Sequence, residues 1–472
     1  MKTYKAIILL CLSAFIITAC FNDDIDDNIQ FSDLEVKDFI WKALNVVYLY
    51  KSEIDDLADD RFSSDEEYTN YLEGFATPND LFESLIFERE TIDRFSILVP
   101  DYIALQQALQ GTSISNGLRF FAFENPSNSA EAILVVSMVA KGSPGESAGI
   151  QRGDYFNQID GVTLTANNIN DLLASDSYTL HFADYDDNGT PEVTDDDFTT
   201  NGNTVALTKT TFTENPVNTT NIIDLNGENV GYIMYRGFRA NFVNELNAAF
   251  GEFAANNVQH LVLDLRYNGG GRVDVAAALG SMITGQHTGE IFTKLFYNET
   301  LQELNSNFLF VNDFNSLNLD KVYILTTGQT ASASELMINS LRPYLSDGVV
   351  QIGTTTEGKP QFSQTIYDSP TLTSEMDANP NHTYAMQPLL GNSSNVNDEL
   401  VPNTGIPANI TIQENVLNLG SFGDVNEPLL AAALADIEGI GRFGEFESPT
   451  RVISKHGAVP FEQEMFVAPT TN

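Results

Sequence analysis

Two segments of this chain repeat one local order, in which an apolar, β-rich run leads into a turn and then into helix-forming residues. The first is HLVLDLR at 260–266, followed by three glycines at 269–271 and a helical pattern over 273–282. The second is KVYILTT at 321–327, followed by a turn and by helix formers over 331–345. Alternating strands and helices favour a layered α/β core.

The second unit places a nucleophile candidate at the junction of strand and helix. Residues 330–335 read TASASE, and Ser332 lies where the helix is predicted to begin. The first N–H groups of a helix lack intrahelical acceptors and carry the positive end of its dipole. The N–H of Ala333 could therefore hold an oxyanion that forms beside Ser332.

A serine hydroxyl needs a base, and Lys359 follows Ser332 in a segment with little charge besides Glu357. A lysine can act as that base only when burial removes its hydration and lowers its pKa from ~10.4 toward neutrality. The glycine turn supplies a candidate for the second oxyanion donor, the N–H of Gly270 or of Gly269. The pattern predicts a hydrolase without a catalytic histidine.

Ser332, Lys359 and the sequence DLRYNGGG at 264–271 resemble the carboxy-terminal processing peptidases, also called tail-specific proteases. The resemblance implies a crotonase-like or ClpP-like α/β catalytic core, with Ser332 as nucleophile, Lys359 as general base and Ala333 as oxyanion donor. The family's glutamine four residues after the lysine is Ser363 here, so Gln364 or Gln361 takes its place. The family's helix aspartate has no equivalent.

A second stretch resembles PDZ domains, which bind the carboxyl ends of peptides. NGLRF at 116–120 is similar to their carboxylate-binding loop, and AGIQRGD at 148–154 matches the middle of such a domain. The resemblance assigns peptide binding to four residues, Gly117, Leu118, Arg119 and Phe120. A peptide would add as a strand on the sheet edge, with its last side chain in an apolar pocket near Leu118 and Phe120.

The first residues resemble a bacterial lipoprotein signal. Lys2 and Lys5 precede an apolar run over 6–17, too short to span a bilayer, and ITAC ends at Cys20. The resemblance implies cleavage before Cys20 and lipid attachment to its thiol. The protein is then expected in the bacterial cell envelope, lipid-anchored and facing the periplasm or the outer-membrane surface.

The net charge limits which classes of partner the protein can bind. With 23 basic and 65 acidic residues the formal charge is −42, which argues against nucleic acid and anionic lipid as partners. One acidic loop, 184–197, spaces oxygen ligands as a calcium loop does, at Asp184, Asp186, Asn188 and Asp195. Calcium binding and a solvated hairpin tip both remain open, and no other cofactor is required.

The predicted organisation is a multidomain α/β protein. It comprises a signal peptide (1–20), an acidic tether (21–30), an N-terminal helical cap (31–110), a β-rich PDZ-like domain (111–214), a peptidase core (215–440) and a C-terminal tail (441–472). The predicted function is a serine endopeptidase with a Ser-Lys dyad, acting on unfolded proteins or proteins with exposed C-termini. The alternative is a non-catalytic peptide- or ligand-binding protein on the same fold.

Overall fold

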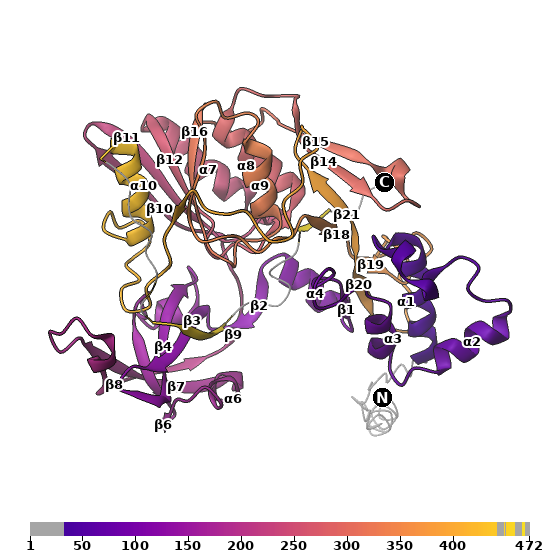
Figure 1. Ribbon diagram of the computed structural model, residues 1–472, viewed down its shortest axis with the longest axis horizontal. Helices are drawn as coiled ribbons and strands as arrows, with labels where there is room; N and C mark the ends of the chain where they lie inside the picture. The colour runs from indigo at the N-terminus through magenta and orange to yellow at the C-terminus, as the bar shows by residue number, and fades with distance from the viewer. Residues whose placement is uncertain (1–32, 441–447, 449, 458–464, 468–472) are drawn as a thin grey trace, which may run out of the picture.

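A six-stranded sheet forms the centre of the computed structural model, which describes residues 33–440, 448, 450–457 and 465–467. Its order is β10-β11-β12-β16-β17-β22, and the strands are parallel except for the β10–β11 hairpin. The strands are β10 Val217–Leu225, β11 Glu228–Tyr235, β12 Val258–Asp264, β16 Lys321–Thr326, β17 Gly348–Gly353 and β22 Ile410–Thr411. The expected layered α/β core is present (Figure 1).

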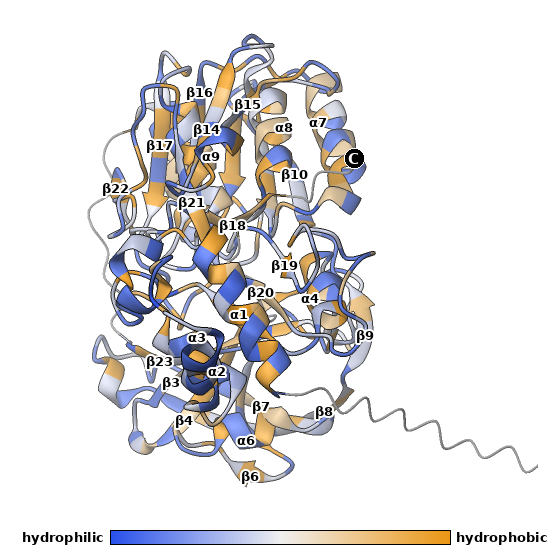
Figure 2. Ribbon diagram, turned by 90° about the vertical axis from the view of Figure 1, so that its right-hand side faces the viewer, coloured by the Kyte–Doolittle hydropathy of each residue, from blue (hydrophilic) through white to orange (hydrophobic). Residues whose placement is uncertain are grey.

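Helices cover both faces of this sheet. They are α7 Val243–Ala255, α8 Val273–Thr284, α9 Ala333–Leu341 and α10 Pro428–Glu438. Leu261 and Leu263 of β12 pack in the core with α7, α8 and α9, whereas Val262 packs with α10 on the opposite face. Strands buried on both faces are apolar along their whole length, and Figure 2 draws β16 and β17 mostly in the hydrophobic colour.

A second sheet lies beside the ends of these elements, in the order β13-β24-β18-β21-β14-β15. Its strands are β13 Gly271–Arg272, β24 Met465–Phe466, β18 Gln361–Ser363, β21 Leu389–Ser394, β14 Ile291–Tyr297 and β15 Ser306–Leu309. The short strand β24, from the C-terminal end of the chain, is parallel to both β13 and β18. These two neighbours follow the glycine turn and Lys359 respectively.

A β-rich domain lies at the lower left of Figure 1, and the N-terminal helices lie at the lower right. Its main sheet has the order β23-β3-β4-β5-β7-β8, with β6 paired to β5. The strands are β23 Val452–His456, β3 Leu118–Asn125, β4 Asn128–Val139, β5 Tyr155–Ile159, β6 Val162–Thr163, β7 Ser177–Asp186 and β8 Asp197–Thr208. Two short helices, α5 Pro144–Ser147 and α6 Ile169–Ala174, belong to the same domain, and β2 Thr112–Ser115 pairs with β9 Thr210–Thr213 beside it.

The described part of the N-terminal region contains four α-helices and also contributes a strand. Its helices are α1 Asp33–Val47, α2 Asp65–Glu73, α3 Pro78–Ser84 and α4 Tyr102–Leu109. Strand β1 Ile97–Val99 pairs with β20 Ala385–Gln387, which pairs in turn with β19 Ile366–Tyr367. The apolar stripe of α1 packs into the same core as α7 to α9. The N-terminal region is thus joined to the core rather than separate from it. Within the described ranges, no helix is long and apolar enough to cross a membrane.

Candidate active site

Ser332 is the N-cap residue of α9 and has a strained backbone, with φ +65° and ψ −118°. Positive φ is uncommon outside glycine, and it is maintained only where surrounding contacts require it. The turn before Ser332 is held by the Thr330 hydroxyl, which donates to the Leu265 carbonyl at 2.8 Å. The Ser332 side chain is completely buried, and its hydroxyl has no hydrogen-bond partner among the described residues. A buried unpaired hydroxyl costs roughly 1–3 kcal/mol, which suggests that it has a functional role.

The glycine turn lies directly against this helix start. The carbonyl of Asn268 accepts hydrogen bonds from the Ala331 N–H at 3.1 Å and from the Ser334 hydroxyl at 2.9 Å. The Asn268 side chain in turn donates to the Tyr235 carbonyl at 3.0 Å. The two strand-turn-helix units found in the sequence therefore meet at one point.

Glu335 connects the serine to the lysine. Its Oε2 accepts the N–H of Ser332 at 2.8 Å and the N–H of Lys359 at 2.9 Å. Its Oε1 accepts the Gly358 N–H at 2.7 Å and the Thr356 hydroxyl at 2.5 Å. The side chain is fully buried, and this burial raises the pKa of Glu335 although the four hydrogen bonds oppose the shift. One carboxylate thus holds the backbones of both candidate catalytic residues.

Lys359 is fully buried, and its Nζ lies 4.6 Å from the centre of the Phe95 ring. The preceding Gly358 has φ +90°, and a Cβ there would lie 2.2 Å from the Asn403 carbonyl oxygen, so only glycine fits before the lysine. Because the Ser332 hydroxyl makes no hydrogen bond to a described residue, Lys359 Nζ is not hydrogen-bonded to it in this conformation. The backbones of Ser332 and Lys359 are thus linked through Glu335, whereas Ser332 Oγ and Lys359 Nζ are not hydrogen-bonded to each other.

The amides near Ser332 differ in their availability as oxyanion donors. Ala333 is the first residue of α9, so its N–H has no intrahelical acceptor. The Gly270 N–H donates to the Asn268 side-chain oxygen at 2.9 Å, and it is therefore occupied, contrary to its predicted role. The buried Gly269 N–H, the alternative named from sequence, has no acceptor among the described residues.

Comparison with known proteins relates the chain to one peptidase family. The model of "Peptidase family S41" matches residues 229–385, which include Ser332, Lys359 and the glycine turn, and the "Peptidase S41 N-terminal domain" matches residues 35–97. A crystal structure of a proposed S41 protease from Bacteroides fragilis aligns with TM-score 0.70 at 26% identity, covering 85% of this chain and 97% of that one. This chain is similar to peptidase family S41 over both regions.

Two curated relatives agree with the S41 assignment. The chain is 26% identical over 222 residues to the chloroplastic C-terminal processing peptidase of Tetradesmus obliquus. It is 27% identical over 246 residues to the carboxyl-terminal-processing protease of Picosynechococcus. These alignments cover 44% and 50% of this chain. They cover 44% and 53% of the relatives, so the chain matches about half of their length.

The region matched by the S41 N-terminal domain closes over the lysine. The Phe95 ring packs against the Lys359 ammonium group, and the Arg94 guanidinium forms an ion pair with the Glu357 carboxylate. Asp93 fixes this segment by accepting hydrogen bonds from the Ser96 N–H at 2.8 Å and the Tyr48 hydroxyl at 2.6 Å. Sequence reasoning missed Phe95, since nothing local in the sequence relates it to a lysine so far along the chain.

Neither glutamine expected to orient Lys359 forms a hydrogen bond with it. The Gln364 side chain makes no hydrogen bond to another described residue, whereas Gln361 donates to the Tyr50 hydroxyl at 3.0 Å. The hydroxyl of Ser363, the residue at the family's glutamine position, donates to the Gln387 side chain at 2.7 Å. The structure brings neither glutamine into hydrogen-bond contact with the lysine.

Asp264 and Arg266 anchor the glycine turn. The completely buried Arg266 pairs with Asp264 at 2.8 Å, with Glu427 at 2.8 Å and with Glu414 at 3.2 Å. Arg152 of the β-rich domain reaches the same Glu414 carboxylate at 2.7 Å. A buried ion cluster therefore joins the β-rich domain to the strand that leads into the turn.

A second charged cluster lies at the start of the core. Glu214 is paired with Arg239 at 3.0 Å and with Arg236 at 3.4 Å. Burial alone raises the pKa of Glu214, but attraction to Arg239, Arg236 and Arg119 outweighs it and lowers the pKa to about 2. This carboxylate stays ionised because its arginine partners are buried with it.

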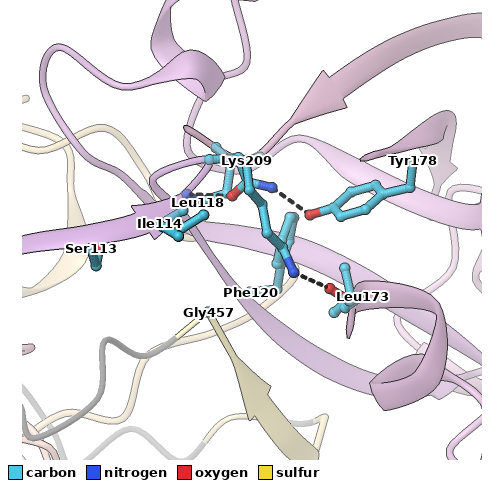
Figure 3. Close-up of a pocket in the computed structure, with 10 residues that line it drawn as sticks. Ser113, Ile114, Leu118, Phe120, Leu173, Tyr178, Lys209 and Gly457 are labelled. Atoms are coloured by element: carbon cyan, nitrogen blue, oxygen red, sulfur yellow. Dashed lines mark hydrogen bonds between the residues drawn. The ribbon is translucent and has the colours of Figure 1, made fainter. Parts of the chain in front are cut away.

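The four residues expected to bind peptide lie at the start of β3. The N–H groups of Gly117 and Leu118 donate to Ser115 Oγ at 3.0 Å and Asn116 Oδ1 at 3.1 Å. These amides are therefore occupied rather than open for a carboxylate. Arg119 is buried, and Phe120 lines a cavity of about 210 Å³ together with Leu118 (Figure 3).

The edge of β3 already carries a strand. β23 pairs with it antiparallel, so the position expected for an added peptide is taken by the chain itself. The sequence did not indicate this contact.

The acidic loop forms a hairpin tip between β7 and β8. Asp184 accepts a hydrogen bond from Asn201 at 2.8 Å, and the Asn188 amide donates to the Asp195 carbonyl at 2.6 Å. Asp186 accepts the Asn188 N–H at 2.8 Å. Over the residues described, no group of three or more acidic, histidine or cysteine side chains is placed to hold a metal. Calcium binding by this loop stays a prediction.

Cys20, the residue expected to carry the lipid, lies outside the described residues.

Proposed function

We propose that this chain is a serine endopeptidase that uses Ser332 and Lys359. The observation that carries the proposal is the Glu335 carboxylate, whose single oxygen Oε2 accepts the N–H groups of both residues. Further support comes from the strained backbone of Ser332 and from its buried hydroxyl, which has no hydrogen-bond partner among the described residues.

The chemistry follows from these positions. Lys359, as an uncharged amine, removes the proton of the Ser332 hydroxyl while its oxygen attacks a peptide carbonyl carbon. The N–H groups of Ala333 and Gly269 hold the oxyanion of the tetrahedral intermediate. Lys359 then gives its proton to the leaving amine, and water hydrolyses the acyl-enzyme. Substrate binding must bring Nζ to Oγ, because the two are not hydrogen-bonded in this conformation.

We further propose that the β-rich domain is a PDZ-like module that receives the carboxyl ends of unfolded or exposed protein chains. The cavity beside Leu118 and Phe120, at the start of β3, supports this role. Attachment to a bacterial envelope through lipid on Cys20 is part of the same proposal and rests on the sequence pattern at 1–20. We expect Cys20→Ser to abolish lipid labelling of the protein. Labelling that persists in this variant would contradict the lipid attachment.

The test of the dyad is cleavage of unfolded casein. We expect Ser332→Ala and Lys359→Ala each to lose at least about a thousandfold in kcat/KM, since each removes a member of one proton-transfer pair. Ser334→Ala is the matched control, because its hydroxyl only bonds the Asn268 carbonyl, and it should keep most of its activity. Equal rates in wild type and in both dyad variants would refute the proposal.

The same experiment decides the second candidate, a non-catalytic binding protein on this fold. The observation favouring it is the missing hydrogen bond between the Ser332 hydroxyl and Lys359. If wild type cleaves no protein substrate while it still binds peptides, the binding function is the correct one.

A further inference from the structure

One edge of strand β3 is covered by β23, a strand from the C-terminal region of the same chain. β23 runs antiparallel to β3 with His456 opposite Phe120, Lys455 opposite Phe121 and Ser454 opposite Ala122. The other edge of β3 pairs with β4, so β3 has one position for an added strand. A strand and a peptide cannot occupy this position together.

β23 is seated as a bound peptide would be. The side chain of Ile453 packs against the apolar core of the β-rich domain, which includes Leu118 and Phe120. At the end of the strand, the backbone of Gly457 approaches β3 so closely that a Cβ would lie 2.1 Å from the Leu118 carbonyl oxygen. Main-chain pairing combined with alternate side chains in apolar sites is how sheets recognise added strands.

The cavity at the end of β23 remains open beside Gly457 (Figure 3). It is bounded by the apolar side chains of Leu118, Phe120 and Leu173, and Lys209 is the one cation among the described residues that line it. The Lys209 ammonium donates to the Leu173 carbonyl at 2.8 Å and to the Ala174 carbonyl at 3.0 Å at the end of α6. A free peptide end would bring both an apolar side chain and a carboxylate to such a cavity, whereas β23 continues as chain.

We propose that β23 is an internal competitor for the peptide site. A protein substrate with an apolar last residue gains the β3 edge only when β23 leaves, and its terminal carboxylate then pairs with Lys209. The inference rests on the proposed peptide-binding role of the β-rich domain. It adds the class of ligand and a step that limits access.

The arrangement also links this edge to the candidate active site. Strand β24 begins at Met465, eight residues after Gly457, and pairs with Gly271 and Arg272 at the end of the glycine turn and with Ser363 after Lys359. Met465 of β24 is completely buried. A test that deletes the tail would therefore damage the core, and a test confined to β23 is required.

An engineered disulfide that reversibly fixes β23 to β3, called the lock below, provides that test. Ala122→Cys with Ser454→Cys places two thiols on directly opposed residues of an antiparallel pair, a separation that suits a disulfide. The full-length chain would carry Cys11→Ser and Cys20→Ser, which removes the other thiols, and Ser332→Ala, which prevents cleavage. The probe is a fluorescein-labelled ten-residue peptide ending in leucine, measured by fluorescence anisotropy.

We expect the oxidised lock to abolish binding and reduction to restore it. A second variant, Lys455→Pro, removes a backbone donor from β23. It should bind the peptide about tenfold or more tightly than the parent chain, because a tethered competitor acts at an effective concentration on the order of millimolar. Lys455→Ala, which keeps the donor, is the matched control and should bind like the parent.

The cation is tested in the Lys455→Pro background. We expect Lys209→Gln to weaken binding of the free-acid peptide about tenfold while leaving the same peptide with a carboxamide end unchanged. Equal affinity of the oxidised and reduced lock overturns the competition, and equal affinity for both peptide ends overturns the role of Lys209. The binding test does not depend on cleavage. If the peptide binds as expected but the chain with Ser332 intact cleaves no casein, only the peptidase proposal fails.

Discussion

Replacing the Glu335 carboxylate with an amide tests whether one side chain positions both candidate catalytic residues. The Glu335 carboxylate accepts four hydrogen bonds, three from N–H groups and one from the Thr356 hydroxyl. In Glu335→Gln the remaining oxygen can accept two of them, and the new NH₂ group faces the other donors. The shape of the side chain is otherwise kept.

The magnitude follows from the donors that lose their acceptor. Each unpaired buried donor costs roughly 1–3 kcal/mol, so two of them lower the free energy of unfolding by roughly 2–6 kcal/mol. The Thr356 hydroxyl can rotate toward another acceptor, which places the expected loss in the lower half of this range. A displacement of Ser332 relative to Lys359 of about 1 Å reduces kcat on the order of a hundredfold.

The assay combines urea unfolding with casein cleavage at pH 7. Glu335→Gln should lower both the urea midpoint and kcat, whereas Ser334→Ala, on the same helix turn, should lose only about 1 kcal/mol through its single bond to Asn268. Unchanged kcat in a Glu335→Gln protein of normal stability would show that the carboxylate does not position the site.

Three further outcomes follow from the charges. Glu214→Gln should remove roughly 3 kcal/mol of stability at pH 7, because the pKa of Glu214 is lowered from 4.5 to about 2. A lowered carboxyl pKa stabilises the fold above about pH 5, and this contribution is lost as pH falls toward 2, so acid titrations of the two proteins should converge there. Arg152→Leu should lower the free energy of unfolding by about 3–5 kcal/mol, since it leaves Glu414 buried with one partner fewer, and an additional Glu414→Leu should restore part of it in urea titrations. Millimolar calcium should raise the Tm if the 184–197 loop binds it, and an unchanged Tm would end that prediction.

Local order in the core could be predicted from the sequence. The apolar runs at 260–266 and 321–327 became β12 and β16, and the helical patterns after them became α8 and α9. Burial on both faces of the central sheet requires continuous apolar runs, and helix starts follow from short-range backbone hydrogen bonding. The same short-range rules place Ser332 at a helix start.

The contacts that assemble the site come from tertiary structure. Glu335 reads in sequence as an ordinary helix-start residue, and only folding brings Gly358 and Lys359 to its carboxylate. The engagement of Gly270 by Asn268, against the predicted role, depends on one side-chain rotamer.

The sequence by itself determined the two strand-turn-helix units of the core and the position of Ser332 at a helix start, because hydrophobic periodicity and helix-start preferences act over a few neighbouring residues. Tertiary structure alone decided that Phe95 covers Lys359 and that β23 covers β3. These contacts join residues hundreds of positions apart. Their free energy comes from burial and from strand pairing between two distant surfaces, and a local sequence pattern does not show which surfaces will meet.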